Sequence, residues 1–399
     1  MTTTAPRARD LGIPFDGRAG RWNAITDVPG VEVGYATIAS GDPAGPGSAS
    51  VARTGVTAIL PRGRDGIGVP CAAGTFSLNG NGELTGRTWI DESGALTLPI
   101  ALTNSHAVGA VHRGVDEWVH RTRPDLSAQW MLPVVGETWD GYLNAINAGN
   151  VRPEHAGAAL DAAHGGAISE GSVGGGTGMT CYGFKGGSGT ASRLVEVGGE
   201  HYTVGVFLQA NFGSRDELRI DGRRLGRSSA APNPMETTAW LERDGERARV
   251  AGGSGSVIVV VATDAPLLPG QCAALARRVP LGLARTGTTA SHFSGDIFLA
   301  FSTANPGALT SMLGHEQGRG LETLAFVPWG RIDPFFAAVV EAVEEATVNA
   351  LVAARDTVGR DGHVAFALPH DEVRSAFAAP PHPSPSVPTT DRQTVKEHE

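Results

Sequence analysis

Short apolar runs, each bounded by turn-forming residues, constrain the fold of this chain more than any other feature. Typical helices need ten residues or more, so runs of this length predict buried β-strands. They occur at residues 56–60, 98–102, 130–135, 204–208, 256–262 and 297–301. Any fold of this chain must therefore bring these strands together and cover both of their faces.

Helical patterns alternate with the predicted strands. Apolar residues recur at helical spacing from Val108 to Val119, and Asp333 followed by Pro334 predicts an N-cap and the first position of another helix. The apolar face of this helix consists of Phe336, Val339, Val340, Val343, Thr347, Ala350 and Leu351. Strands mixed with helices predict a layered α/β or α+β protein.

Glycine is unusually abundant and helps to define the domain organisation. It accounts for 55 of 399 residues, about twice the common share of ~7%. The glycines form non-periodic clusters between apolar runs, which indicates tight turns and close backbone approach. No linker of shifted composition divides the chain, so we expect one large domain over residues 1–377. Residues 378–399 are rich in proline and polar residues and predict a disordered tail.

Charge and cysteine usage exclude several classes of partner. The net charge of −9 disfavours nucleic acid or an anionic membrane, because both prefer basic surfaces. Cys71, Cys181 and Cys272 are odd in number and far apart, which indicates reduced, buried thiols and neither a disulfide framework nor a zinc site. We find no stretch typical of a signal peptide or a membrane span, so we expect a soluble cytoplasmic protein.

The step from Gly255 to Ser256 places a hydroxyl at the start of an apolar strand, directly after a residue without a side chain. This arrangement suits a chain that cleaves itself before Ser256 and then uses the new N-terminal serine as a nucleophile. Glycine can adopt backbone angles closed to other residues, which would let its carbonyl tilt towards the hydroxyl. The alternative is a Gly/Ser turn that leads into a core strand.

Seven motifs in a consistent order extend this hypothesis over residues 20 to 350. They are residues 23–31 (NAITDVPGV), 79–86 (NGNGELTG), 133–138 (PVVGET), 174–179 (GGGTGM), 209–213 (QANFG), 255–256 (GS) and 294–298 (SGDIF). With them the chain resembles the aminopeptidases that include the L-aminopeptidase/D-amidase-esterase and the β-peptidyl aminopeptidases. Such a series of motifs is far more specific than any one of them.

The resemblance implies an αββα sandwich that is made as one precursor and cleaved into two interlocked subunits, residues 1–255 and 256–399. It also implies oligomers of such heterodimers and the release of N-terminal residues, L-, D- or β-configured, from small peptides, amides or esters. No cofactor or metal is expected. Two alternatives remain open: acyl transfer to an amine, as in the ornithine acetyltransferases of the same fold class, and an uncleaved binding protein.

Proton transfer at the nucleophile needs partners, because a serine hydroxyl is weak without a base in reach. By resemblance these are Ser294, which relays the proton, and Asp296, which orients or polarises Ser294. Their two-residue spacing puts both side chains on one face of an extended segment. A triad of Ser256, His292 and Asp296 is the alternative, because triads are defined by geometry and not by chain order.

The remaining site residues follow from the same resemblance. Asn211 is expected to donate a hydrogen bond to the oxyanion, with the backbone N–H of Val257 as the second donor. Glu137 could pair with the ammonium group of a substrate, which would make the enzyme an exopeptidase. The family often has tyrosine two residues after this glutamate; here Trp139 stands in that position, so a role that needs a phenol falls to Tyr142 or is absent.

The glycine cluster at residues 174–178 invites comparison with a phosphate-binding loop. It lacks the lysine and serine or threonine that end a P-loop, and its spacing differs from a dinucleotide fingerprint. We therefore interpret it as close backbone packing near the site and predict no nucleotide.

Overall fold

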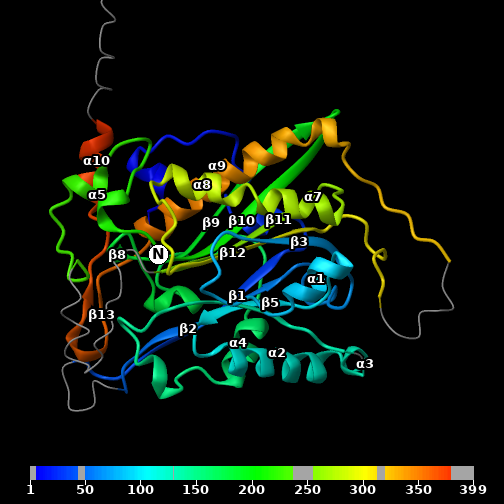
Figure 1. Cartoon of the computed structure of the whole chain (residues 1–399), viewed down its shortest axis with the longest axis horizontal. Helices are drawn as coiled ribbons and strands as arrows, with labels where there is room; N and C mark the ends of the chain where they lie inside the picture. Colours follow the sequence, from blue (N-terminus) through cyan, green and yellow to red (C-terminus); the bar gives the residue numbers. More distant parts are fainter. Residues whose placement is uncertain (1–5, 44–49, 129, 237–254, 312–319, 379–399) are drawn as a thin grey trace, which may run out of the picture.

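Four layers make up the molecule, in the order helices, sheet, sheet, helices (Figure 1). The computed structural model describes residues 6–43, 50–128, 130–236, 255–311 and 320–378. One sheet has the strand order β1-β2-β5-β6, and the other has the order β4-β3-β12-β11-β10-β9. This arrangement confirms the predicted αββα sandwich in a single mixed α/β domain.

The strands of the smaller sheet are β1 (Glu32–Ser40), β2 (Ala52–Leu60), β5 (Ile100–Asn104) and β6 (Val134–Thr138). Those of the larger sheet are β3 (Cys71–Ser77), β4 (Ala95–Leu96), β9 (Gly187–Val197), β10 (Glu200–Asn211), β11 (Ser256–Thr263) and β12 (Gly295–Ser302). Two short ribbons pair β7 (Thr180–Cys181) with β8 (Phe184–Lys185), and β13 (Thr357–Val358) with β14 (Val364–Ala365).

Helices cover the outer face of each sheet. On the larger sheet lie α7 (Pro269–Ala276), α8 (Val279–Arg285) and α9 (Asp333–Val352), and on the smaller sheet lie α2 (Val108–Thr122) and α4 (Pro153–Asp161) (Figure 1). The remaining helices are α1 (Arg87–Ser93), α3 (Pro124–Ser127), α5 (Leu225–Ser228) and α10 (His370–Ala378). No helix among the described residues is long and apolar enough to cross a membrane.

Strand β11 shows why the central strands read as continuous apolar runs. Successive side chains of a strand point to opposite faces. Val257, Val259 and Val261 belong to the core shared with α9, whereas Ile258 and Val260 belong to the core between the two sheets. A third apolar cluster, which includes Val115 and Trp118 of α2, fills the space between the smaller sheet and its helices. Both faces of β11 are buried, so the run cannot alternate with polar residues.

The predicted strand at residues 130–135 is wrong in its first four residues. Trp130 is 83% exposed and Leu132 is 45% exposed, and the strand begins only at Val134. Pro133 has no N–H to contribute to a ladder, which explains why pairing starts after it. The other five runs lie in or overlap β2, β5, β10, β11 and β12.

The helix predicted at Asp333 begins there, but Ile332 occupies the N-cap position, so the predicted cap was one residue late. The three cysteines are free and buried, as expected. The predicted tail lies outside the described residues from 379 onwards, and residues 252–254 of the glycine-rich segment before Gly255 also lie outside them.

Candidate active site

Three neighbouring strands bring the predicted catalytic residues to one end of the larger sheet. Asn211 ends β10 and lies opposite Ser256, the first residue of β11. On the other side Ser256 lies opposite Gly295 of β12, which stands between Ser294 and Asp296. Adjacent strands are ~4.8 Å apart, so residues distant in sequence become immediate neighbours. Ser256 is only 3% exposed.

The Gly255 carbonyl is fixed by this strand pairing. It accepts a hydrogen bond from the Gly295 N–H over 3.2 Å. A Cβ atom at position 255 would lie 2.2 Å from the Asn211 carbonyl oxygen and 2.8 Å from Phe212 Cα. Both contacts are with backbone, which cannot give way cheaply, so only glycine fits before Ser256. The steric reason for a glycine directly before Ser256 is therefore this close approach of the β10 backbone.

Ser294 and Asp296 form a direct hydrogen-bonded pair. The Ser294 hydroxyl donates to Asp296 Oδ1 over 2.5 Å, and Asn79 Nδ2 donates to Oδ2 over 2.8 Å. Burial raises the pKa of Asp296, and the hydrogen bonds from Ser294, Asn79 and the Val257 N–H act against this shift. The carboxylate thus has neutral donors around it.

Asn211 has one end of its amide group fixed. Its Oδ1 accepts the backbone N–H of Thr180 over 2.9 Å. An asparagine amide has one acceptor end and one donor end, so this bond assigns Oδ1 to Thr180 and leaves Nδ2 as the donor. Within the described part of the chain, Nδ2 has no recorded hydrogen-bond acceptor, which is the state expected of a group that awaits an oxyanion.

The backbone of Trp139 supplies a second donor. Its N–H lies 3.3 Å from Ser256 Oγ. The Val257 N–H, expected as the second oxyanion donor, stays a prediction. The Trp139 N–H is a further backbone donor, and it lies against the nucleophile. The residue after β6 and the last residue of β10 thus both adjoin Ser256 at the start of β11.

Glu137 is a buried carboxylate beside these groups and is 6% exposed. Its Oε1 accepts the Glu83 N–H over 3.0 Å, and its Oε2 accepts the Ser105 hydroxyl. Burial raises its pKa, whereas these two hydrogen bonds lower it. A Cβ atom at Gly82 would lie 2.9 Å from Gly295 Cα and 3.2 Å from Glu137 Oε1. Glu137 therefore lies within a few ångströms of the segment that carries Ser294 and Asp296.

Comparison with known proteins identifies the family of this site. The pattern of peptidase family S58 matches residues 23–365. The chain belongs to peptidase family S58. It is 45% identical over 370 residues to the β-peptidyl aminopeptidase BapA of Sphingosinicella microcystinivorans, and the aligned residues cover 93% of this chain and 91% of that protein. The corresponding enzyme of Sphingosinicella xenopeptidilytica is 43% identical over 389 residues, 94% of this chain and 91% of that protein.

Solved structures give the same result. The L-aminopeptidase D-Ala-esterase/amidase of Ochrobactrum anthropi, described as a serine aminopeptidase with a variant of the Ntn hydrolase fold, matches with a TM-score of 0.84 and 42% identity over 94% of this chain and 98% of that chain. A Burkholderia β-aminopeptidase matches with a TM-score of 0.82 and 43% identity over the same shares. The predicted family, fold class and enzyme class, a hydrolase of the aminopeptidase type, are confirmed.

Tyr142 of this S58 peptidase is 2% exposed. Its hydroxyl donates to the Val364 carbonyl over 3.2 Å, and its ring stacks on His363 at 4.8 Å between centroids. Trp139 packs against the same small cluster. The phenol proton is thus used by a backbone acceptor, and the structure brings the Trp139 N–H, but not the Tyr142 hydroxyl, into hydrogen-bond contact with Ser256.

His292 does not join the nucleophile of the S58 peptidase. Its side chain is exposed, and its ring packs edge-on against Phe293 at 5.1 Å between centroids. Both oxygens of Asp296 already accept hydrogen bonds from other residues. The geometry therefore favours the pair of Ser294 and Asp296 over a histidine triad.

The glycine cluster forms a buried turn, Gly174–Gly178, as close packing near the site requires. A Cβ atom at Gly176 would lie 2.4 Å from the Ser188 nitrogen, and one at Gly178 would lie 2.1 Å from the Arg53 carbonyl oxygen. The turn leads directly to Thr180, the residue that orients Asn211. No group of three or more metal-ligating side chains occurs among the residues that the structure describes.

Sequence reasoning assigned no role to Asn79, Ser105 or Thr180, although each contacts a predicted site residue. Asn79 opens the motif at residues 79–86, so its presence in a matched motif was the available signal. Thr180 directly follows the motif at residues 174–179, which was the available signal for it, whereas Ser105 lies in no matched motif. Their roles depend on which strand ends meet.

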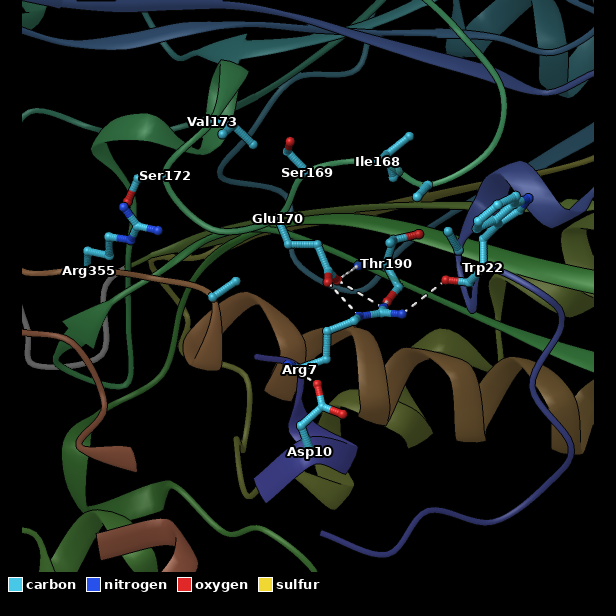
Figure 2. Close-up of a pocket in the computed structure, with 13 residues that line it drawn as sticks. Arg7, Asp10, Trp22, Ile168, Ser169, Glu170, Ser172, Val173, Thr190 and Arg355 are labelled. Atoms are coloured by element: carbon cyan, nitrogen blue, oxygen red, sulfur yellow. Dashed lines mark hydrogen bonds and ion pairs between the residues drawn. The ribbon is translucent and has the colours of Figure 1, made fainter. Parts of the chain in front are cut away.

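A separate cavity of about 550 Å³ lies beside the N-terminal segment. Figure 2 shows Arg7 and Glu170 pointing toward one another inside it, with an Nε–Oε2 distance of 2.7 Å. Arg7 also donates to the carbonyls of Trp22, Asn23 and Thr190. Its guanidinium is therefore used to tie the N-terminal segment to strand β9, and we do not consider this cavity a candidate active site.

Proposed function

We propose that this S58 peptidase cleaves itself between Gly255 and Ser256 into residues 1–255 and 256–399, and that Ser256 then removes N-terminal residues from small peptides, amides or esters. The observation that carries the proposal is the meeting of Ser256 with the Ser294–Asp296 pair and Asn211 at adjoining strand ends. The two fragments stay associated because strands from both belong to one sheet.

Maturation follows from the position of the Gly255 carbonyl. The Ser256 hydroxyl attacks the Gly255 carbonyl carbon, the C–N bond breaks, and the Ser256 nitrogen takes up the proton that the hydroxyl loses. Water then hydrolyses the ester, which gives a carboxylate on Gly255 and a free α-amine on Ser256. The contact between the Gly255 carbonyl and the Gly295 N–H holds the scissile group in place and supports this step.

Substrate hydrolysis uses the same groups. The new α-amine of Ser256 has an ordinary pKa of about 8 and can share proton transfer with the Ser294 hydroxyl. Ser294 donates its own proton to Asp296, so its lone pairs face the other side and can accept from the nucleophile. Asn211 Nδ2 and the Trp139 N–H stabilise the oxyanion; one such donor contributes ~3 kcal/mol.

Glu137 defines the enzyme as an exopeptidase. Its buried carboxylate has only neutral donors, the Ser105 hydroxyl and the Glu83 N–H. A substrate ammonium would supply the missing cation and offset the cost of desolvating the carboxylate. The names of the relatives make β-amino acid and L-amino acid amides the first substrates to test, together with D-amino acid amides and esters.

The test of maturation is a mass spectrum of the purified protein with N-terminal sequencing of its fragments. We expect two chains of 255 and 144 residues, since 399 − 255 = 144, with Ser256 at the start of the smaller one. Ser256→Ala is expected to give one uncleaved, inactive chain, because the attacking oxygen is gone. A small fragment that starts at another residue would contradict the assignment.

We also propose that the cleaved heterodimers assemble into oligomers and that the enzyme works in the cytoplasm. The free, buried state of Cys71, Cys181 and Cys272 supports a reducing compartment. Size-exclusion chromatography with light scattering tests the assembly, and a mass equal to one heterodimer would overturn it. Fractionation of the source cells tests the compartment.

A further inference from the structure

Lys185 is a fully buried lysine at the end of β8, close to the candidate site. Burial of an ammonium group is costly unless each of its donors finds an acceptor. Lys185 Nζ donates to the carbonyls of Gly176, Met179 and Gly186 over 3.2, 2.9 and 2.9 Å. Three N–H donors thus meet three backbone acceptors. No step proposed so far uses this group.

One of these acceptors belongs to the peptide that orients Asn211. The Met179 carbonyl and the Thr180 N–H are the two ends of a single peptide unit. Lys185 Nζ holds the carbonyl end, and the N–H end donates to Asn211 Oδ1 over 2.9 Å. Hydrogen bonds in a chain polarise one another. The Met179 carbonyl also accepts the Gly186 N–H over 2.9 Å. Lys185 Nζ adds a second contact that holds the plane of this peptide and strengthens its N–H as a donor.

A buried carboxylate stands on the other side of the glycine turn. A Cβ atom at Gly178 would lie 2.8 Å from Asp140 Cβ, and Asp140 directly follows Trp139. Burial lowers the pKa of Lys185 to about 7, and the negative charge of Asp140 acts against this lowering. Burial likewise raises the pKa of Asp140 to about 7. Lys185 thus contacts the turn Gly174–Gly178 at the Gly176 carbonyl, and Asp140 lies beside Gly178.

We propose that Lys185 is a positioning residue of the oxyanion hole: it holds the Met179–Thr180 peptide so that the Thr180 N–H binds Asn211 Oδ1 and turns Asn211 Nδ2 towards the reacting carbonyl. The inference rests on the proposed function of Ser256 and Asn211. Lys185 acts on the chemical step and not on the substrate ammonium, which Glu137 binds from β6.

The first test is Lys185→Met, which keeps the volume and removes the charge. We expect kcat for an aminoacyl p-nitroanilide to fall about 10- to 100-fold, because loss of an oxyanion donor itself costs about 10²- to 10³-fold. KM should change less than about threefold. Phe184→Leu is the matched control, since Phe184 is the neighbouring fully buried residue of β8 and lies outside this chain of contacts. It should lower the melting temperature and leave kcat nearly unchanged.

A double-mutant cycle with Asn211→Ala separates positioning from a general loss of structure. If Lys185 acts through Asn211, adding Lys185→Met to Asn211→Ala should cost little further activity. If the substitutions slow maturation, the rate of conversion into two fragments can replace kcat as the quantity compared in the double-mutant cycle. Multiplicative effects of the two substitutions, or a rise in KM alone, would overturn the inference. Activity of Ser256→Ala would instead overturn the proposed function.

Thr180→Pro covers the case in which Lys185→Met does not fold. Proline removes the N–H that binds Asn211 Oδ1, together with the threonine side chain. The three carbonyls that Lys185 contacts belong to other residues and stay in the chain. The preceding residue, Met179, has φ −81° and ψ 149°, which is the conformation that a residue before proline prefers. We expect the same loss of kcat with KM preserved. Wild-type kcat in folded Thr180→Pro would overturn the inference.

Discussion

Two clusters of buried carboxylates in this peptidase differ in how their charge is balanced. Near the N-terminal segment, Glu345 lies 2.7 Å from Arg9 Nε and 2.8 Å from Arg193 Nη2. In the candidate site, Glu137 and Asp296 accept hydrogen bonds from hydroxyl, amide and backbone N–H groups. One cluster contains two arginines. In the other, these hydrogen-bond donors are neutral, and a charge on His106 acts on the pKa of Glu137 only as a minor cause.

The pKa values follow this difference. Burial alone would raise the pKa of Glu345, but the hydrogen bond and charge of Arg9 and the charge of Arg193 lower it overall. Burial raises the pKa of Glu137 and of Asp296, and their neutral donors do not reverse it. A carboxylate with internal cations stabilises the fold. A carboxylate without them is available to a substrate ammonium or to a proton in transfer.

The largest effect is expected from the proton-transfer pair. Ser294→Ala and Asp296→Ala should each lower turnover or self-cleavage about 10²- to 10⁴-fold, as loss of a general acid or base group does. His292→Ala is the control and should be nearly silent. The measurements are kcat on an aminoacyl p-nitroanilide and the rate of fragment formation. If His292→Ala is the most damaging of the three, the triad is correct and the pair is not.

The paired cluster should respond in stability and not in activity. Glu345→Gln leaves Arg193 buried without its closest anion and should cost about 3 kcal/mol of unfolding free energy, the usual effect of breaking a buried ion pair. Urea denaturation measures this loss. Turnover of the folded fraction should stay close to that of the wild type. A tenfold drop in kcat would show that the two clusters do not divide the roles as we infer.

Glu137→Gln should raise KM by about tenfold, since a charge-assisted contact contributes about 1.5 kcal/mol or more. Self-cleavage should remain intact because it involves no free substrate amine. N-acetylated substrates, which lack the charge and add bulk, should not be hydrolysed by the wild type. Equal turnover of free and N-acetylated substrates would favour a general amidase or an acyltransferase and rule out the aminopeptidase.

The smallest effect is an opposite pH dependence of the two glutamates. The folded state raises the pKa of Glu137, so it binds more protons than the unfolded chain does, and this site loses stability as pH rises above about 4.5. The melting temperature of Glu137→Gln relative to wild type should therefore increase with pH through that window.

For Glu345 the folded state lowers the pKa, so the sign reverses. Its stabilising contribution is complete above about pH 4.5 and is lost as pH falls through the lower, folded value. The advantage of wild type over Glu345→Gln should shrink in acid. Melting curves of the two variants between about pH 3 and pH 7, the range that brackets glutamate titration, measure both trends. Parallel curves would contradict the comparison.

The sequence predicts the central strands because both of their faces are buried, so their residues form continuous apolar runs. Residues 256–262 of β11 are an example. Strands β1, β3 and β9 escaped prediction, since they contain many alanine, glycine, serine and threonine residues and show no apolar run. Their pairing depends on partners far along the chain, and a local pattern does not contain that information.

The sequence by itself predicted a layered protein from its buried runs and the family from its ordered motifs, because both are local signals. Through that resemblance it also predicted the αββα layering and the site residues Ser256, Ser294, Asp296, Asn211 and Glu137. Only the tertiary structure decided the contacts between strand ends. It brought Asn79 to Asp296 and the Trp139 N–H to Ser256. It also brought Lys185 Nζ to the carbonyl of the Met179–Thr180 peptide, whose N–H binds Asn211. Hydrogen-bond partners are fixed by register and crossover connections between strands, and no single segment encodes these.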